Sequence, residues 1–278
     1  MSSRYIGIAA IKFKRLVDYL QRIDLDVQVI AKNAGLSIEA IQQASDESIL
    51  SAYDYSKLFK QSVLAMQTLR RPLPWAAGVG SEIFEMLCRC LIGCKTLGEA
   101  LDRAQKFDAL LYPISGYKIS VYQDQGFCHL KYHIDPLNVD KVFIPADWDR
   151  YDSYDTIIKA SGLLVWHALC GWLIGRTIEA HGLQISAPEV GEAYTISVEK
   201  LIDCSVEFDA EINQLVFAEE FLDFRLVQTA ESLEEFLKNT VYELILSEKK
   251  PASTSAAIKS LVGLDFEQGM PTFSEIAA

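Results

Sequence analysis

The chain has 278 residues, of which 50% are hydrophobic, enough for a sizeable buried core. Its net charge is −12, and a surface this acidic repels phosphate backbones, so these residues are not expected to form a nucleic-acid-binding face. Charges within residues 1–24 argue against a signal peptide, and the longest uncharged apolar run, 160–175, is too short to span a membrane. We therefore expect a cytoplasmic protein with free thiols.

The first part of the chain has the apolar spacing of helices. Asp26 is a plausible N-cap and Gly35 a stop signal for one of them. Thr96 and Glu99 form the signature of a capping box, which predicts a new helix just past Cys94. Helices are thus expected at 13–23, 26–35, 51–66, around 88–94 and at 96–107, with breaks at 70–75 and 78–80.

The second part mixes short strands with helices. Residues 117–122 and 127–134 alternate as strands and are joined by QDQG, which predicts a hairpin. A run that is apolar all round predicts a buried helix at 160–176. Further strands are expected at 182–187, 205–208 and 214–217, and helices at 197–202 and 232–246, the last opened by Ser232 and Glu235.

This order predicts an α+β fold, mostly helical, with the helices packed on a small antiparallel sheet. The polar stretch that begins SEKKPASTS has the composition of a linker. We therefore divide the chain into a domain at 1–246 and a linker at 247–263.

Three of the six cysteines, Cys88, Cys90 and Cys94, lie within seven residues of one expected helix. Cys90 and Cys94 share a face, but Cys88 points about 160° away from Cys90, so three thiolates cannot converge on one ion. The other cysteines are isolated in apolar runs, where cysteine packs as a small hydrophobe. No metal site and no cofactor is expected here.

The motifs of common enzymes are missing from the sequence: there is no Gly-x-Gly-x-x-Gly, Walker loop, Gly-x-Ser-x-Gly or His-Glu-x-x-His. His129 and His133 share one face of a strand with Lys131, which is compatible with a metal pair, a pocket wall or a solvated sheet face. His167, in the apolar helix, has the setting of a hydrogen-bonded core histidine. The acidic run 147–155 lacks the glycine and final glutamate of an EF-hand, so a solvated helix entry is preferred to a calcium loop. No catalytic residue is assigned.

Two longer stretches resemble the effector domain of one branch of AraC-type transcription regulators, often labelled "arabinose-binding domain". The first, EMLCRCLIGCKTLGEALDRAQKFDALL, is similar to that branch's pair of helices joined at Thr-Leu-x-Glu-Ala-Leu. The second, CSVEFDAEINQLVFAEEFLDFRLV, is similar to its Cys-Pro-Val-x-Phe element, with Ser205 and Arg225 in place of prolines. HLKYHIDPL, WLIGR and AGLSIEAIQQASDESILSAYDYSKLF also fit, so the resemblance runs from about residue 25 to 245.

The resemblance extends to the C-terminus. MPTFSEIAA resembles the start of the first helix of the family's DNA-binding module, with Pro271, Glu275 and Ala277 in register. Residues 264–278 are therefore expected to be the beginning of a truncated helix-turn-helix domain, although a frayed tail would also fit. The sequence does not have the all-strand pattern of the cupin barrel in the arabinose-responsive founder of the family, so a sugar ligand is not implied.

The resemblance implies a domain that senses a small-molecule effector, forms a homodimer and controls promoter DNA binding by a C-terminal module. A fatty or amino acid derivative is the expected class of effector. The alternatives are a metal-dependent or other catalytic domain that uses the His129 and His133 pair, and a dimerisation domain without ligand.

Two sets of residues are predicted to carry these roles. An acidic effector is expected between the hairpin, the buried helix and the aromatic break, with Arg176 as a carboxylate clamp. The apolar stripe of helix 232–246 is well placed to pair two subunits, although packing onto its own domain would fit as well. The candidate ligand-binding residues are Trp75, Tyr117, His129, His133, Trp166, Trp172 and Arg176, and the candidate dimerisation residues are Leu233, Phe236, Leu237, Val241 and Leu244.

Overall fold

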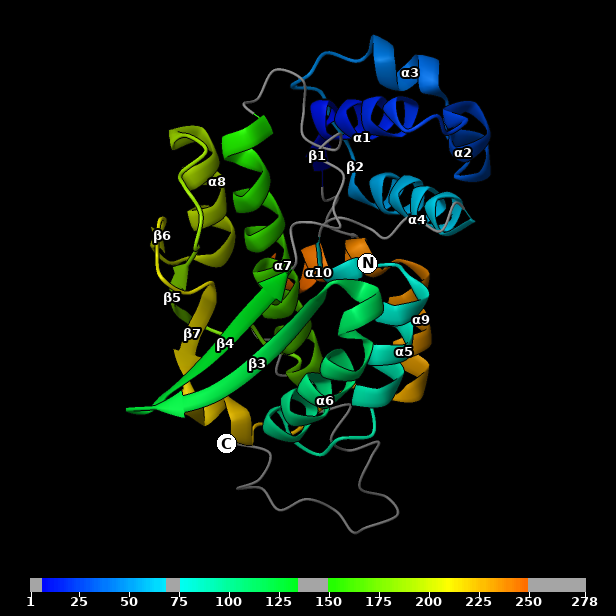
Figure 1. The fold of residues 1–278 in the computed structure, drawn as a ribbon. Helices are drawn as coiled ribbons and strands as arrows, with labels where there is room; N and C mark the ends of the chain where they lie inside the picture. Colours follow the sequence, from blue (N-terminus) through cyan, green and yellow to red (C-terminus); the bar gives the residue numbers. More distant parts are fainter. Residues whose placement is uncertain (1–6, 69–75, 135–149, 250–278) are drawn as a thin grey trace.

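The long helix α7 (Arg150–Ile174) runs behind a five-stranded sheet in the computed structural model, and the N-terminal helices form a separate group at the upper right of Figure 1. The structure describes residues 7–68, 76–134 and 150–249. Within this part the fold is α+β with an open sheet, which confirms the predicted class.

The sheet has the strand order β3-β4-β7-β5-β6. The predicted hairpin is confirmed: Asp124 pairs with Phe127, and Gln125 and Gly126 make the turn with φ angles of 50° and 85°, as a tight hairpin turn requires. One detail differs from the expected antiparallel sheet, because β5 and β6 pair in parallel. The strands are β3 (Tyr117–Asp124), β4 (Phe127–Ile134), β5 (Ala180–Gln184), β6 (Val206–Glu207) and β7 (Gln214–Ala218).

Four helices and a small two-stranded ribbon form the N-terminal layer. The Asp26 carboxylate accepts hydrogen bonds from the backbone N–H groups of Gln28 (3.0 Å) and Val29 (3.1 Å), so the predicted N-cap is confirmed. The three-residue strands of the ribbon were not expected from the sequence. The elements are β1 (Gly7–Ala9), α1 (Ala10–Arg22), α2 (Val27–Asn33), α3 (Ile38–Gln43), β2 (Ile49–Ser51) and α4 (Ala52–Thr68).

The remaining helices flank α7 and the sheet. Thr96 caps α6 as predicted, since its hydroxyl accepts a hydrogen bond from Glu99 N–H at 3.3 Å. The elements are η1 (Ala76–Gly78), α5 (Glu82–Leu91), α6 (Leu97–Ser115), α8 (Glu192–Ile202), η4 (Glu219–Asp223), α9 (Ala230–Lys238) and α10 (Thr240–Lys249).

The helix predicted to be buried is the centre of the core. Strands β4 and β7 pack against α7, and so do α6, α10 and η1. Residues Asp155–Ile174 are long and apolar enough to cross a membrane, yet 72% of their most apolar stretch is buried within the protein. This helix therefore has the burial of a core helix.

The cysteines pack as small hydrophobes, as predicted. Cys88 and Cys94 are buried and Cys90 is half-buried, and all six cysteines of the chain are free. Burial raises the pKa of the Cys88 and Cys170 thiols, so these groups stay protonated at neutral pH.

The prediction of one continuous helix over 232–246 is wrong. Thr229 and Ser232 form a reciprocal capping box that starts α9 at Ala230, and the chain leaves helical geometry at Asn239 (φ −139°, ψ 45°) before α10 begins. Across this break, the Lys60 ammonium of α4 donates to the carbonyl oxygens of Leu237 (3.1 Å) and Lys238 (3.2 Å). A cation at the C-terminus of α9 stabilises the end of that helix.

Several predictions concern residues outside the described part of the chain. Trp75, the first residues of the acidic run 147–155, and the helix-turn-helix start at 264–278 lie there. Helix α10 continues to Lys249, past the predicted domain end at 246. The division into domain, linker and DNA-binding start remains a prediction.

The crossing of α7 over β4 depends on Gly162, where an added Cβ would overlap the ring of Tyr132. We expect Gly162→Ala to lower the free energy of unfolding by about 1–3 kcal/mol, because the buried ring has no room to move. Chemical denaturation would measure this loss. The matched control is Gly182→Ala in β5, where a Cβ meets nothing within 4 Å and no loss is expected. Equal stability of the two variants would contradict this account of the α7 crossing.

Candidate functional site

The structure separates the residues predicted to bind a ligand. Trp166 is buried in the core, and Trp172 stacks on Phe236 of α9 with ring centroids 4.1 Å apart. Tyr117 is buried on β3. Of the three cavities described below, one is lined by His129 and another by Arg176, and none of the three is lined by two of the predicted residues.

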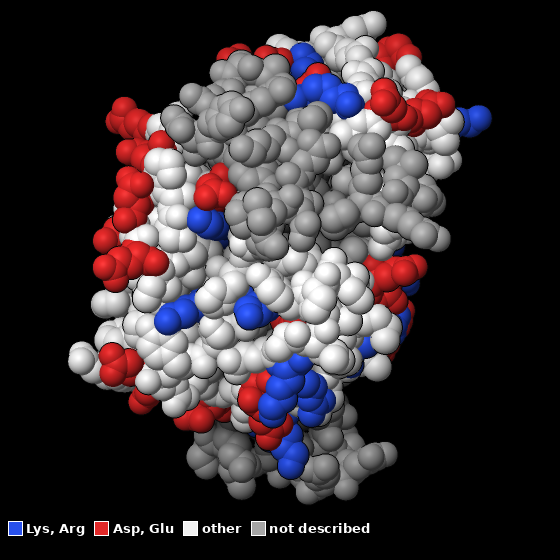
Figure 2. Space-filling view, viewed as in Figure 1, with Lys and Arg blue, Asp and Glu red and all other residues white. Residues whose placement is uncertain are grey.

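His129 and His133 lie on the outer side of the β3–β4 hairpin, a largely uncharged face in Figure 2. His129 stacks on Tyr122 (4.6 Å between ring centroids), and Lys131 Nζ lies 4.5 Å from the centre of the same ring. His133 Nε2 is 3.2 Å from the Ser120 hydroxyl. Desolvation, with smaller effects from neighbouring lysines, lowers the pKa of His133, so a neutral ring is favoured at physiological pH.

A shallow hollow of about 460 Å³ lies over the outer face of the sheet, next to His129. A chain of hydrogen bonds crosses it: the Tyr122 hydroxyl donates to Gln214 (3.4 Å), Gln214 donates to Gln184, and Gln184 donates to Glu207 (2.6 Å). These polar groups satisfy one another across the strands. They therefore offer a ligand few free hydrogen-bonding positions.

Arg176 lines a hollow of about 340 Å³ at the end of α7. Its guanidinium lies 4.6 Å from the centre of the Phe224 ring, and Glu179 and Glu220 line the same hollow. Two carboxylates in one hollow oppose the binding of a ligand carboxylate. This setting weakens the predicted role of Arg176 as a carboxylate clamp.

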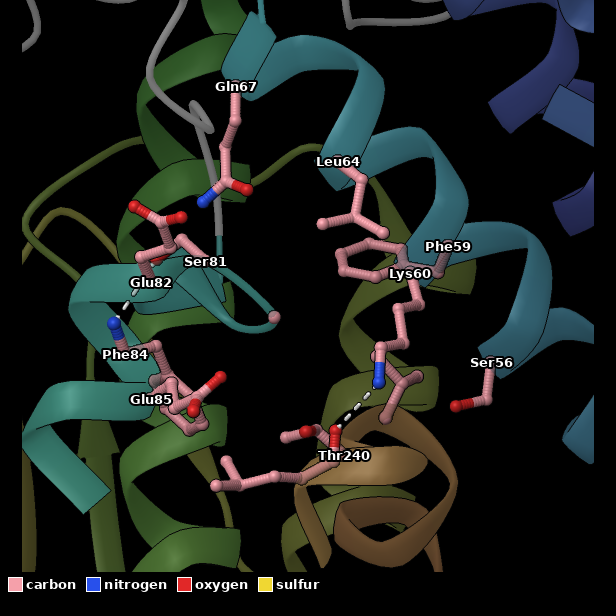
Figure 3. A pocket seen from close by; sticks show the side chains of 13 residues that line it. Ser56, Phe59, Lys60, Leu64, Gln67, Ser81, Glu82, Phe84, Glu85 and Thr240 are labelled. Carbon is pink, nitrogen blue, oxygen red and sulfur yellow. Dashed lines mark hydrogen bonds between the residues drawn. The ribbon is translucent and has the colours of Figure 1, made fainter. Parts of the chain in front are cut away.

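A third cavity, of about 170 Å³, lies between α4, α5 and the break from α9 to α10, and we call it the interhelical cavity (Figure 3). It combines apolar walls with a few polar groups, the usual composition of a small-molecule site. Its lining residues are Ser56, Phe59, Lys60, Leu64, Gln67, Gly80, Ser81, Glu82, Phe84, Glu85, Leu237, Thr240 and Val241.

Helix α4 contributes the basic side of this cavity. Lys60 reaches across to the carbonyl oxygens at the end of α9, and one of these contacts is drawn in Figure 3. One turn earlier, the buried Ser56 hydroxyl accepts a hydrogen bond from Tyr242 N–H of α10 at 3.3 Å. Helix α4 thus holds the end of α9 and the start of α10 by three hydrogen bonds.

Helix α5 contributes the acidic side. Ser81 caps this helix through Phe84 N–H (3.2 Å), which places Glu82 in its first turn at the mouth of the cavity. Glu85 pairs with Arg89 (2.8 Å), and Arg89 also pairs with Glu234 of α9 (2.7 Å). The hydrogen bond from Arg89 lowers the pKa of Glu234, so the link between α5 and α9 persists at neutral pH.

A separate group of polar side chains is buried beneath β3. The Asp108 carboxylate of α6 accepts a hydrogen bond from Ile119 N–H (3.2 Å), and burial raises its pKa to about 7. The Tyr117 hydroxyl lies against the backbone of Gly78, where a side chain would overlap it. The preceding Ala77 has a φ of 47°, a conformation that costs a non-glycine residue about 1–3 kcal/mol. The packing of α6, β3 and η1 therefore keeps the backbone of Ala77 in a strained conformation next to the buried Tyr117 hydroxyl.

The interhelical cavity lies within an α+β domain and has a volume of about 170 Å³. The family model described as "Arabinose-binding domain of AraC transcription regulator, N-term" matches residues 25–226, so the chain belongs to this family. The resemblance seen in the sequence is thereby confirmed over most of its length.

One solved structure of a regulator is similar to the chain. It is the transcriptional regulator CdpR from Pseudomonas aeruginosa, at 14% sequence identity and a TM-score of 0.40, with 100% of this chain and 76% of that chain covered. No curated protein matches the chain.

The residues of the interhelical cavity were missed in the sequence because they are of ordinary types. Lys60 and Glu82 come from separate helices, and Thr240 follows a break that the apolar spacing conceals. One local feature, the N-cap residue Ser81, does indicate where α5 begins and therefore that Glu82 lies in its first turn.

The raised pKa of Asp108 predicts a pH dependence of stability. Between the ordinary value of 3.8 and about 7, the unfolded carboxyl ionises while the folded one stays protonated, so stability falls as the pH rises through this window. Asp108→Asn keeps an acceptor for Ile119 N–H and removes the titration. We expect its thermal midpoint to exceed that of the wild type by a few degrees above the window and by much less below it. A constant difference across the window would contradict the burial of an ionisable carboxyl here.

Proposed function

We propose that this domain senses a small molecule and controls DNA binding by a helix-turn-helix module that follows it. Membership in the AraC-type family supports a regulatory role. The observation that carries the proposal is the position of the interhelical cavity, which lies directly against the break between α9 and α10. Helix α10 leads into the proposed linker, 247–263, and from there to the proposed start of the DNA-binding module at 264–278. The protein would act in the cytoplasm, where its promoter DNA lies.

The contacts around the cavity provide a route from ligand to DNA-binding module. A ligand between α4 and α5 would touch Thr240 and Val241 and compete for, or reinforce, the Lys60 contacts to α9. If the ligand bound more tightly when α10 is in one of two positions, the ratio of the two populations would change by the ratio of the two affinities. Sensing is thereby coupled to the direction in which the chain leaves the domain.

The charge distribution supports DNA binding by another part of the protein. Figure 2 shows acidic side chains along the edge of the molecule where α8 and β6 lie in Figure 1, and α8 itself carries Glu192 and Glu199. The basic side chains on this face lie away from that edge, and those grouped at the lower centre have acidic side chains beside them. A phosphate backbone would be repelled along that edge.

We also propose that the domain forms a homodimer. Of the stripe predicted for pairing, Leu233, Phe236 and Leu244 are buried in the core of their own protomer, and Leu237 and Val241 line the cavity. Because this stripe is buried, an exposed apolar surface is the better candidate for the dimer interface. The most exposed large apolar side chains of the described residues are Leu110 (76%) and Ile114 (71%), one turn apart on α6.

The sensing proposal predicts a local effect of the effector. A compound that raises the thermal midpoint of the domain should also slow amide hydrogen exchange in α9 and α10, because it contacts both helices. The internal control is α1, which does not line the cavity and should keep its exchange rates. Stabilisation without any change in α9 and α10 would contradict coupling through this cavity.

The dimerisation proposal predicts a dimer by light scattering at tens of micromolar protein. Leu110→Lys should shift the protein towards monomer, because a charge would replace an exposed apolar contact. Val29→Lys is the matched control, since Val29 is 52% exposed on α2, away from α6, and should leave the dimer intact. A monomeric wild type would contradict dimerisation, and a dimeric Leu110→Lys variant would place the interface elsewhere.

A further inference from the structure

Helix α6 covers one edge of the five-stranded sheet with its side chains. Strand β3 comes first in the strand order, so one side of it pairs with β4 and the other has no strand beside it within the described residues. Three N–H groups along β3 point to this open side, and a side chain of α6 accepts a hydrogen bond from each. The bonds run from Tyr117 N–H to Ser115 Oγ (3.4 Å), from Ile119 N–H to Asp108 Oδ2 (3.2 Å) and from Val121 N–H to Gln105 Oε1 (2.8 Å).

These side chains take the place of a neighbouring strand. An uncovered edge strand presents N–H and C=O groups that can pair with another strand, and proteins commonly cover such an edge with a helix or a loop. Here α6 packs along β3 and provides the cover. The edge of β3 can therefore pair with another strand only when α6 moves away.

Of the three acceptors on α6, only Asp108 changes its charge with pH. The hydroxyl of Ser115 and the amide of Gln105 stay neutral. The Asp108 side chain is 2% exposed, and the N–H group of Ile119 is its hydrogen-bond donor. An ionised carboxylate is strongly disfavoured in such a buried place unless a cation pairs with it, so the closed position of α6 favours the protonated form.

The ionisable side chains nearest to Asp108 are neutral. Tyr117 of β3 and Tyr132 of β4 lie near it, and Cys88 of α5 lies near Tyr117. Burial raises the pKa of all three groups, so none of them is charged at neutral pH.

The charged side chains of the neighbouring elements are directed elsewhere. Lys118 Nζ of β3 lies 4.5 Å from the centre of the Tyr112 ring, and Asp102 and Lys106 of α6 pair with each other at 2.6 Å. Among the described residues, α7 and η4 bring no charge that acts on Asp108. The Asp108 carboxyl therefore has no counter-ion within this part of the chain.

We propose that Asp108 is a pH-sensitive latch that holds α6 on the edge of β3, firmly in acid and more loosely towards neutral pH. With α6 closed, burial raises the pKa of Asp108 to about 7, whereas with α6 moved away the carboxyl meets water and titrates near its ordinary value of 3.8. Between these two values the open position releases a proton that the closed position keeps. Each pH unit in this window therefore favours opening by up to about tenfold, and outside the window the balance stays constant.

Helix α6 connects this latch to the surface of the protein. The exposed residues Leu110 and Ile114 follow Asp108 on the same helix. A looser α6 would therefore also change the surface proposed for dimerisation. That consequence rests on the dimerisation proposal, whereas the latch does not depend on it.

The test is amide hydrogen exchange of the wild-type protein across the window, with rates corrected for the pH dependence of exchange in an unfolded chain. We expect protection of the Ile119 and Val121 amides to fall by about tenfold from about pH 5.5 to about pH 6.5. Amides of the central strand β7 should exchange more slowly and respond to dilute urea, because global unfolding releases them, whereas local opening of α6 exposes little surface. Protection of β3 that does not change with pH would overturn the proposal. So would equal rates and equal urea dependence in β3 and β7, because α6 would then move away only on global unfolding.

Variants of α6 separate the titration from the packing. Asp108→Asn keeps an acceptor for Ile119 N–H, and protection of β3 should become independent of pH. The matched control is Asp102→Asn, which removes an exposed carboxylate from the same helix and should keep the wild-type pH dependence. Gln105→Ala removes the neutral acceptor of Val121 N–H and should lower protection by about fivefold at every pH, with the dependence on pH unchanged. This variant and the wild type keep the proposal testable if Asp108→Asn does not fold. A pH dependence that persists in Asp108→Asn, or one that disappears in Gln105→Ala, would overturn it.

Discussion

The apolar surface of α7 is the constraint on which the rest of the structure depends. A helix with apolar side chains all round has to be covered on every side, and here β4 and β7, α6, η1 and α10 share that task. Two of its tryptophans are buried, and Trp172 is covered by Phe236 of α9. The last described helices are therefore part of the core as well as the exit from the domain. Movement of α10 away from α7 would expose apolar surface, so any change in its position has to be small or compensated.

Much of the fold could be predicted because its signals are local. Asp26, Thr96 and the Gln125–Gly126 turn act through hydrogen bonds and dihedral angles within a few residues, and each begins or ends an element where the sequence indicated. The two-residue strand β6 and its parallel pairing with β5 could not be predicted, because so short a strand has no periodicity of its own. The strands β1 and β2 could not be predicted for the same reason, since each has only three residues.

The break at Asn239 and the candidate site have a different cause. Apolar residues keep helical spacing from Leu233 to Leu244, so the sequence alone favours one helix, whereas the break is stabilised by Lys60 of a distant helix. The predicted ligand-binding residues are of types that often line binding sites, but residue type alone does not distinguish a site from the core. Trp166 and Trp172 supply core volume instead, whereas the cavity is lined by lysine, glutamate, serine and threonine that meet only in the folded protein. Side chains brought together by tertiary packing leave no pattern in a single sequence.

The contact between Lys60 and Leu237 joins residues that are 177 positions apart in the chain. During synthesis, α4 emerges from the ribosome long before α9 and α10 exist, so the part of α4 that packs on α10 and this ammonium have no partner until most of the domain has been translated. Contacts of such long sequence separation form late and slow folding. The N-terminal layer therefore has to remain soluble while incomplete, a period in which uncovered apolar surface invites aggregation or chaperone binding. The joint that the proposed effector would control is thus also one of the last parts of the domain to be assembled.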